Sequence, residues 1–442
     1  MIAMALSQKI KKPANSAPEG IFLALTKIIL WALLLPCAFD MRGAKIGLGP
    51  LSFYLTTSRI AIFLICALTA PWFFKKALPL IWREYRELFL SGCAFLLIAG
   101  LAAFLGRHPG LGAERLLFYG SFFYLFCAGL VLPGRFVRKI PLYIFALGVV
   151  LAAIGCWEFY RVEVKVFLDY VFIPMTGNQS RASFQNPTTF GCLTVIALAC
   201  GWIYRERLGL ATLLFSCLAL TGGVIFSASR LAALGLAVFM LGLAALLIFS
   251  GRSWKNFLVA LTLAAAFFWT MSHYKDYFGP QRIKQAFIKA GPAFSSPEAF
   301  DAFSSRRYSA WKAAWSIWKD HPWLGVGPGA YDRHMGDYEE HKPLWLGSRG
   351  FEHPHNLFFW ILSETGLAGI AAFFIFCYFL VRRIVNAGPI ERAWPLAMFL
   401  FFEMFELLVK DAYPSLILTL LALYAARGFE ASEPENSQNL VR

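Results

Sequence analysis

Two histidines stand where the longest polar stretch of the chain, residues 274–356, meets the next apolar run, in His353-Pro354-His355-Asn356. A neutral imidazole can take a proton from a hydroxyl nucleophile, which makes His355 a candidate general base. The side chain of Asn356 can orient that imidazole or cap the helix that follows. The alternative interpretation is that both histidines only pack at a membrane interface.

The two histidines do not have the spacing of a zinc site. His353 and His355 are two residues apart with Glu352 beside them, and the HExxH pattern is absent. Zinc-binding histidines on a helix lie one turn apart, on one face. The sequence therefore predicts no metal and no cofactor at this position.

Arginines at the ends of apolar runs form a second group. Arg181 precedes one run, Arg230 lies in a short turn between two others, and Arg306 and Arg307 open a tryptophan-rich segment. Guanidinium groups match phosphate oxygens by paired hydrogen bonds, so together they predict a pyrophosphate site. Each arginine taken alone can equally be an interfacial residue whose charged head reaches water.

Two glutamates, Glu403 and Glu406, lie three residues apart in an apolar run near the C-terminus. An intramembrane carboxylate is typical of proton or ion coupling. The alternative is a structural role, with hydrogen bonds to neighbouring helices or to Lys410. A proton-coupled transporter of lipid or glycan is therefore one hypothesis.

Composition indicates what kind of scaffold holds these residues. Of the 442 residues, 58% are hydrophobic and 15% are charged, with a mean hydropathy of +0.59. Soluble proteins carry about 25% charged residues. The apolar runs, about 18–22 residues each, are long enough to cross the hydrocarbon as helices. We predict an all-α polytopic membrane protein.

Twelve transmembrane helices are predicted, at about 20–39, 51–73, 88–105, 115–132, 140–160, 188–204, 209–226, 231–250, 255–273, 356–381, 393–409 and 413–427. The chain then divides into a cytoplasmic tail (1–19), helices one to nine (20–273), a periplasmic loop or lid (274–355), helices ten to twelve (356–427) and a second cytoplasmic tail (428–442).

Loop charges predict the orientation. The net charge is +15, and its basic residues cluster in the N-terminal tail and in alternate short loops. Short basic loops are typical of the cytoplasmic side, so both termini are expected there. The same clustering favours contact with anionic lipid over nucleic acid as the reason for the charge. The polar stretch 274–355 then faces the periplasm of a bacterial inner membrane.

Part of this stretch has helical periodicity. Aromatic residues recur every three or four positions at Tyr308, Trp311, Trp315 and Trp318, which predicts a helix over about 304–320. His321-Pro322 ends it. The glycines of Gly325-Val326-Gly327-Pro328-Gly329 then predict a turn-rich link.

Several motifs together resemble the bacterial O-antigen ligase and O-antigen polymerase superfamily. They are Arg181-Ala182-Ser183-Phe184, Ser229-Arg230-Leu231, Ser305-Arg306-Arg307-Tyr308 with Trp311, His321-Pro322, Gly325 to Gly329, His353 to Asn356, and Glu364-Thr365-Gly366-Leu367-Ala368-Gly369. The resemblance spans the whole architecture and is most specific from Arg306 to Gly369. It implies a GT-C-like membrane fold and metal-independent, inverting glycosyl transfer on the periplasmic face.

The resemblance also implies substrates and roles. The donor would be a glycan on undecaprenyl pyrophosphate, and the acceptor a lipid A–core sugar hydroxyl in ligases or the growing glycan in polymerases. His355 corresponds to the essential histidine, Arg230 to the arginine between two helices, and Arg307 to the loop arginine. The adjacent Arg306 leaves that last choice open by one position, and Arg181 matches less closely. We expect a ligase, with a polymerase as the alternative.

Overall fold

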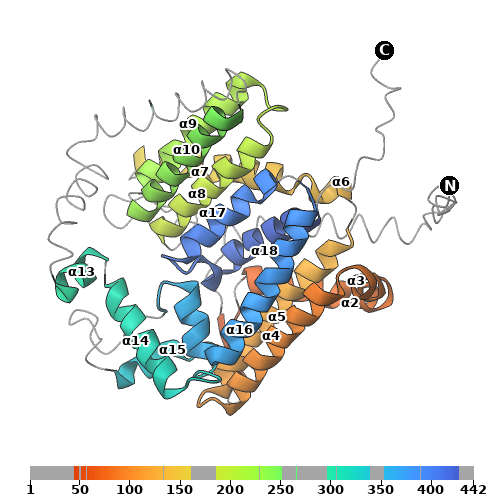
Figure 1. Cartoon of the computed structure of the whole chain (residues 1–442), viewed down its shortest axis with the longest axis vertical. Helices are drawn as coiled ribbons and strands as arrows, with labels where there is room; N and C mark the ends of the chain where they lie inside the picture. Colours follow the sequence, from red (N-terminus) through yellow and green to blue (C-terminus); the bar gives the residue numbers. More distant parts are fainter. Residues whose placement is uncertain are drawn as a thin grey trace.

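The computed structural model describes residues 44–48, 51–55, 57–132, 134–160, 186–227, 229–250, 265, 296–304, 306–338, 353–388 and 390–427. Figure 1 shows the chain. Arg181, the predicted helix at 20–39 and nearly all of the one at 255–273 lie outside the described residues.

Helices make up almost all of the described structure. They are α2 (Thr57–Trp72), α3 (Leu78–Glu84), α4 (Arg86–Leu105), α5 (Pro109–Leu130), α6 (Gly134–Val137), α7 (Ile140–Tyr160), α8 (Pro187–Ile203), α9 (Leu210–Phe226), α10 (Arg230–Ser250), α13 (Pro297–Phe303), α14 (Arg307–Asp320), α15 (Tyr331–His334), α16 (Leu357–Asn386), α17 (Trp394–Glu403) and α18 (Ala412–Arg427). A π-helix, η1 (Phe73–Ala77), joins α2 to α3, and short 3-10 turns include η6 (Leu408–Lys410).

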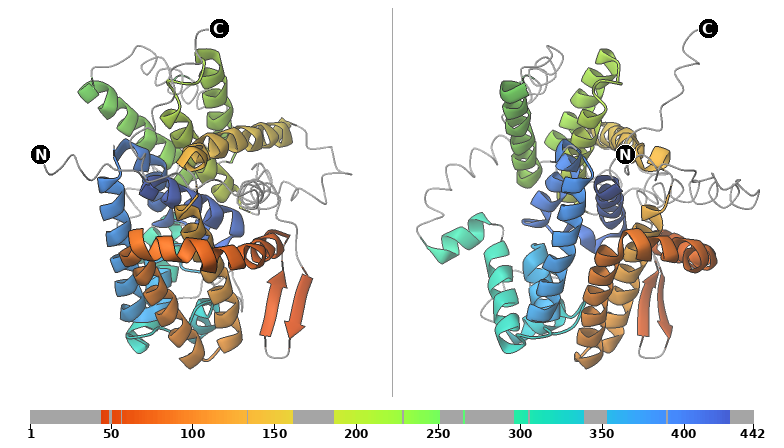
Figure 2. Two further views of the ribbon diagram at one scale, coloured as in Figure 1. Left: turned by 90° about the vertical axis from the view of Figure 1, so that its right-hand side faces the viewer. Right: turned by 45° about the vertical axis from the view of Figure 1, so that its right-hand side comes forward.

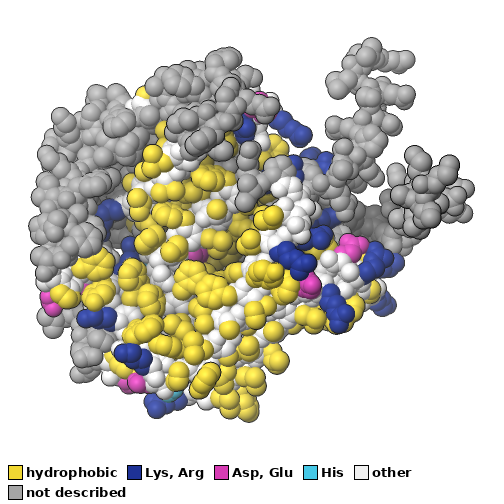
Figure 3. All heavy atoms as spheres, viewed as in Figure 1, with side chains coloured by type: hydrophobic (Ala, Val, Ile, Leu, Met, Phe, Trp, Pro, Cys, Tyr) yellow, Lys and Arg dark blue, Asp and Glu magenta, His cyan; other side chains and the backbone are white. Residues whose placement is uncertain are grey.

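Among the residues that the structure describes, four helical segments are long and apolar enough to cross a membrane: Arg59–Glu84, Arg86–Leu105, Ile140–Trp157 and Leu357–Asn386. Shorter apolar helices run from 187 to 203, 210 to 226, 230 to 243, 394 to 403 and 414 to 427. In Figure 3 apolar side chains cover the middle of the visible face, with many of the charged ones toward its edges. These features are those of a helical membrane protein.

The structure differs from the prediction at the start of the second predicted transmembrane helix. The run 51–73 was expected to be helical throughout, but Leu51–Leu55 forms strand β2, which pairs antiparallel with β1 (Ala44–Leu48). The helix α2 begins only at Thr57. Hydropathy cannot separate a short apolar strand from the start of a helix, because both are apolar and differ only in their partners.

The helices form two groups with a pair between them. In Figures 1 and 2, α7 to α10 lie together on one side, and α4, α5 and α16 lie on the other. α17 packs against α8, and α18 packs against α5, α7 and α16. α17 and α18 therefore join the two groups, and the turn between them lies deep in the protein.

The helix α16 contains a break at Gly366, where φ is 64° and ψ is −162°. Residues 322–327, which we call the link segment, pack into this break in α16. The N–H groups of Leu367 and Ala368 donate to the carbonyls of Pro322 (2.8 Å) and Trp323 (3.1 Å). In return, the N–H groups of Val326 and Gly327 donate to Ser363 (3.0 Å) and Glu364 (2.9 Å). The link thus supplies backbone partners that the interrupted helix cannot provide for itself.

Gly366→Ala is expected to lower the unfolding midpoint strongly. A Cβ there would lie 2.4 Å from the carbonyl carbon of Trp323, and the positive φ is unfavourable for any side chain. We expect a loss of at least about 2 kcal/mol. Thermal unfolding in detergent measures it. Gly120→Ala, with no atom within 4 Å of its Cβ position, is the matched control and is expected to be neutral or slightly stabilising; equal midpoints for the two variants would contradict the strained role of Gly366.

Candidate functional site

The tryptophan-bearing helix forms as predicted, as α14, and ends before His321. Its buried residues, however, are Ala310, Ala313, Ala314 and Ile317, and it packs against α16. Small side chains allow this close approach, while the ring of Trp311 stacks on Phe359 with centroids 5.9 Å apart. Trp315, by contrast, is 43% exposed. The α14–α16 contact brings the first residue of α14 toward the start of α16.

Arg306 and Arg307 point to different partners. Arg306 precedes α14 with a left-handed backbone (φ 67°), and its Nη1 lies 3.1 Å from Oδ2 of Asp301. Arg307 begins α14, and its Nη2 lies 2.8 Å from Oε2 of Glu406. Arg306 therefore pairs with a residue close to it in sequence, whereas Arg307, the next residue, reaches the buried carboxylate of Glu406, which is distant in sequence.

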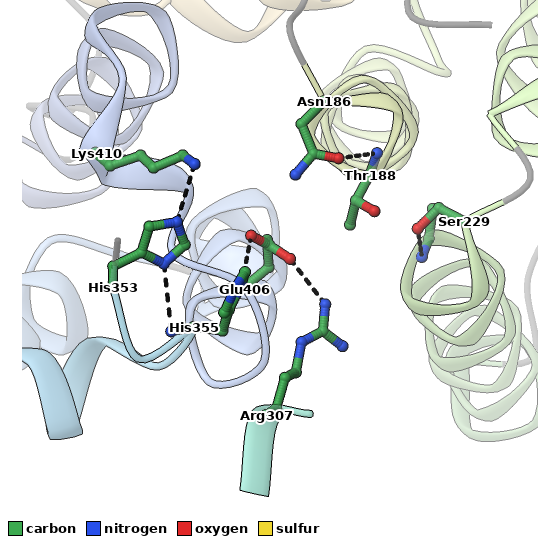
Figure 4. A network of polar contacts seen from close by, with 9 residues as sticks. Asn186, Thr188, Ser229, Arg307, His353, His355, Glu406 and Lys410 are labelled. Carbon is green, nitrogen blue, oxygen red and sulfur yellow. Dashed lines mark hydrogen bonds and ion pairs between the residues drawn. The ribbon is translucent and has the colours of Figure 1, made fainter. Parts of the chain in front are cut away.

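His355 approaches the same carboxylate from the other side. Its Nδ1 lies 3.0 Å from Oε1 of Glu406, so one carboxylate bridges the imidazole and the Arg307 guanidinium (Figure 4). The backbone of His355 has φ 52°, a conformation that non-glycine residues rarely adopt. Such strain persists only where the surroundings hold the residue in place. We name His355, Glu406 and Arg307 the His–Glu–Arg cluster.

Glu406 lies in the turn after α17, although the sequence predicted a helix through residue 409. The reason is local: the N–H of Val409 donates to the carboxylate of Glu403 (3.1 Å), which closes a turn instead of another helical one. Glu406 is 2% exposed. Burial raises the pKa of its carboxyl, but the hydrogen bond and charge of His355 and the charge of Arg307 outweigh burial. This pKa therefore lies well below its usual value, and the group is ionised at neutral pH.

His353 forms a second layer behind His355. The two rings lie 4.2 Å apart, and Nε2 of His353 is 2.9 Å from Nζ of Lys410. Burial and the charge of Lys410 lower the pKa of His353 well below its usual value, so the ring stays neutral. A neutral imidazole has one acceptor nitrogen. When Nε2 of His353 accepts a hydrogen bond from the Lys410 ammonium, Nδ1 carries the ring proton. The backbone N–H of His355, 3.3 Å from Nδ1, then makes a close contact and no hydrogen bond.

Asn356 caps α16, one of the two roles considered for it. Its Oδ1 accepts from the N–H of Phe359 (3.0 Å), and its Nδ2 donates to the carbonyl of Met404 (2.7 Å). The amide thus joins the start of α16, next to His355, to the turn that carries Glu406. This double contact fixes the histidine and its carboxylate relative to each other.

Asn356→Ala is expected to destabilise the protein by about 1–3 kcal/mol, since it removes a helix cap and a second hydrogen bond. The unfolding midpoint in detergent measures the loss. Asn386→Ala, at the exposed far end of the same helix, is the matched control and should leave the midpoint unchanged. A midpoint for Asn356→Ala equal to that of the control would show that the cap is unimportant.

The start of α10 lies close to α8. A Cβ on Gly191 of α8 would lie 2.4 Å from Oγ of Ser227 and 2.7 Å from Cβ of Ala232, so only glycine allows this approach. Arg230 is the first residue of α10 and is exposed. In Figure 4 Thr188 and Ser229, in the first turn of α8 and just before α10, lie on the Arg307 side of Glu406. The N-termini of α8 and α10, which are the positive ends of their helix dipoles, therefore lie on the same side of Glu406 as Arg307.

Three side chains of this region offer ligand atoms that lie within 4.8 Å of one another: His353, His355 and Glu406. Two of these atoms, Nδ1 of His355 and Oε1 of Glu406, are hydrogen-bonded to each other. Lys410 and Arg307 stand directly beside the group. The positive charges of Lys410 and Arg307, each in contact with one of the three side chains, repel a divalent cation at this position. The donor set therefore fits a metal poorly.

The site contains two residues whose roles the sequence did not identify. For Glu406 the sequence predicts either ion coupling or bonds to neighbouring helices or to Lys410, and its contacts are with His355, just before α16, and with Arg307 of α14. Lys410 was considered only as a partner for the glutamates, and it contacts His353. The available signal was a carboxylate in an apolar run, which indicates a role but not a partner.

The fold and the cluster define a helical membrane protein with a histidine–carboxylate pair beside an arginine. Residues 215–374 match the protein family described as O-antigen ligase. The match runs from α9 into α16 and includes Arg230, Arg307 and His355. It supports a glycosyltransferase-type enzyme of the ligase or polymerase kind that acts on lipid-linked glycans. No curated protein matches the chain.

Proposed function

We propose that the protein is an O-antigen ligase that transfers a glycan from undecaprenyl pyrophosphate to a sugar hydroxyl of lipid A–core, on the periplasmic face of the inner membrane. The observation that carries this proposal is the bridging carboxylate of Glu406, 3.0 Å from His355 and 2.8 Å from Arg307. It places a candidate base and a candidate phosphate ligand side by side.

His355 is the general base of this proposal. The ionised Glu406 accepts a hydrogen bond from Nδ1–H of His355, so the proton stays on Nδ1 and the free lone pair is on Nε2. Nε2 takes the proton of the acceptor hydroxyl as its oxygen bonds to the anomeric carbon of the donor. The bond between that carbon and the phosphate oxygen breaks, and undecaprenyl pyrophosphate leaves with the electron pair. Attack opposite the leaving group inverts the anomeric configuration.

The leaving pyrophosphate is bound by arginines. Arg307 uses one of its five N–H donors for Glu406, so the others can serve phosphate oxygens. Arg230, at the start of α10, and Arg181 complete the group. Arg306 supports the loop through Asp301 rather than binding substrate. Donors that are already positioned stabilise the charge on the leaving group, so no metal is required.

A transfer assay with purified protein tests the proposal. The protein is mixed with lipid-linked glycan, with or without lipid A–core, in the presence of a chelator. A shifted lipid A–core band supports the ligase. A ladder from donor alone indicates the polymerase instead. Movement of intact lipid across a vesicle membrane without transfer would indicate a transporter, and loss of transfer with chelator would contradict the metal-free mechanism.

A further inference from the structure

A polar cavity of about 240 Å³ lies behind His353, on the side away from the His–Glu–Arg cluster. Its charged lining residues come from four parts of the chain: Glu114 and Arg115 of α5, Asp332 and Arg333 of α15, Glu364 of α16, and Lys410 of η6. Neither Arg230 nor Arg307, the arginines of the described part of the chain that are proposed to bind the donor pyrophosphate, lines it. This cavity is therefore separate from the proposed pyrophosphate site.

The carboxylates of the polar cavity already have partners. Glu114 pairs with Arg59 of α2, and Asp332 lies 3.9 Å from Arg333. Glu364 interacts with the N–H group of Gly329, with the charge of Arg115, with the Trp360 side chain and with the N–H group of Tyr331. These groups balance much of the negative charge around the cavity.

Two of its cations make no direct contact with a carboxylate in the described part of the chain. Among the described residues, Arg115 and Lys410 are in no ion pair: Arg115 lies over the ring of Trp360 (5.9 Å), and Lys410 contacts the imidazole of His353. Nη1 of Arg115 is buried without a hydrogen-bond partner in the described part of the chain. A half-buried guanidinium with one buried, unpaired nitrogen, standing beside an ammonium, is stabilised by an anion that can accept from both. The polar cavity has the charge to bind one.

An apolar cavity, also about 240 Å³, adjoins the polar one. Trp360 and Glu364 line both cavities, so they meet at these side chains. Rings such as Phe118, Phe122 and Phe376, from α5 and α16, form much of its wall. A cavity with a charged lining and a cavity with an apolar lining therefore lie next to each other inside the helix bundle.

We propose that the paired cavities bind a phosphorylated amphiphile, with its phosphate ester at Arg115 and Lys410 and a hydrocarbon chain among the phenylalanines. The inference rests on the proposed function in that it adds a second lipid site to the same transferase. Because the rings of His353 and His355 are 4.2 Å apart, the bound phosphate lies one imidazole away from the base. Because the donor pyrophosphate is assigned to Arg307 and Arg230, the phosphate that fits this second site is one of the acceptor glycolipid.

Binding of dodecyl phosphate to the full-length protein in zwitterionic nanodiscs tests this, with native mass spectrometry as the readout. Arg115→Gln is expected to weaken binding by about tenfold or more, since it removes a charge-assisted hydrogen bond. Arg115→Lys keeps the charge and should lose less. Arg382→Gln removes an exposed arginine paired with Glu87 on the surface and should bind as the wild type. Equal affinities of Arg115→Gln and Arg382→Gln would overturn the proposal.

The apolar end has its own test. Ala422→Leu adds a larger side chain to the wall of the apolar cavity and is expected to weaken dodecyl phosphate binding severalfold while leaving the unfolding midpoint near that of the wild type. Dodecanol should bind more weakly than dodecyl phosphate. Dodecanol binding as tightly as the phosphate, or no effect of Ala422→Leu, would overturn the assignment.

Competition identifies the source of the phosphate. Displacement of dodecyl phosphate by lipid A–core supports the assignment to the acceptor, and displacement by the pyrophosphate-linked donor alone overturns it. Displacement by neither overturns the proposal. The transfer assay and the binding assay have independent outcomes. Glycan transfer without Arg115-dependent binding of dodecyl phosphate would contradict only the cavity proposal. Arg115-dependent binding without glycan transfer would contradict only the proposed ligase function.

Discussion

His355→Ala is expected to lower the rate of glycan transfer by about 10²- to 10⁴-fold while leaving the protein folded in the membrane. The reason is that the group proposed to take the acceptor proton would be lost, while Arg307 and Glu406 would remain paired. Transfer to lipid A–core under single-turnover conditions, with chelator present, measures the chemical step.

The matched control for this experiment is His108→Ala. His108 is exposed, precedes α5 and contacts the ring of His334, far from Glu406 in sequence and absent from its polar contacts among the described residues. It should transfer at the wild-type rate. Full activity of His355→Ala, with an unfolding midpoint like that of the wild type, would refute the general-base assignment.

Glu406→Gln is expected to cause a loss of similar size, about 10²- to 10⁴-fold, with the larger part in kcat. Arg307 can only donate hydrogen bonds, so the amide oxygen of the substituted side chain turns toward it. The amide NH₂ then faces Nδ1 of His355, which must accept, and the ring proton moves to Nε2. His355 would remain in place but could no longer act as a base.

Glu403→Gln separates this effect from general damage. Glu403 is equally buried, three residues away, and accepts from the N–H of Val409, which a glutamine oxygen can also do. Its variant should retain transfer. The removal of a buried charge beside Arg307 also costs stability, about 3–5 kcal/mol for a broken buried pair, so unfolding midpoints accompany both assays. Transfer by Glu406→Gln at the rate of Glu403→Gln would show that the carboxylate does not act on the base.

The sequence predicted helices well where hydropathy alone decides them. The runs 140–160 and 188–204 correspond to α7 (Ile140–Tyr160) and α8 (Pro187–Ile203). It did not predict the break in α16 at Gly366 or the strand pair that includes Leu51–Leu55. Both depend on partners elsewhere in the chain, the link segment and β1, and a local pattern contains no information about partners.

The candidate site likewise contains some residues that the sequence indicated and others whose roles depend on partners elsewhere in the chain. His355, Asn356 and Arg307 were accessible from residue type and position beside an apolar run, and from the family resemblance. The role of Glu406 was not, because it follows His355 by 51 residues and meets it only through the packing of the α17–α18 turn against the start of α16. The choice between Arg306 and Arg307 likewise depends on the left-handed backbone at Arg306, which turns the two side chains apart.

The four hydrogen bonds between the link segment and the break in α16 have a consequence for donor selectivity. They tie the chain that follows α14 to the helix that follows His355, so backbone hydrogen bonds as well as Glu406 hold the spacing between Arg307 and His355. In the mechanism we propose, a donor is then matched only over the atoms between its pyrophosphate and its first anomeric carbon. We expect the enzyme to discriminate among first sugars and to be indifferent to how many repeat units lie beyond them.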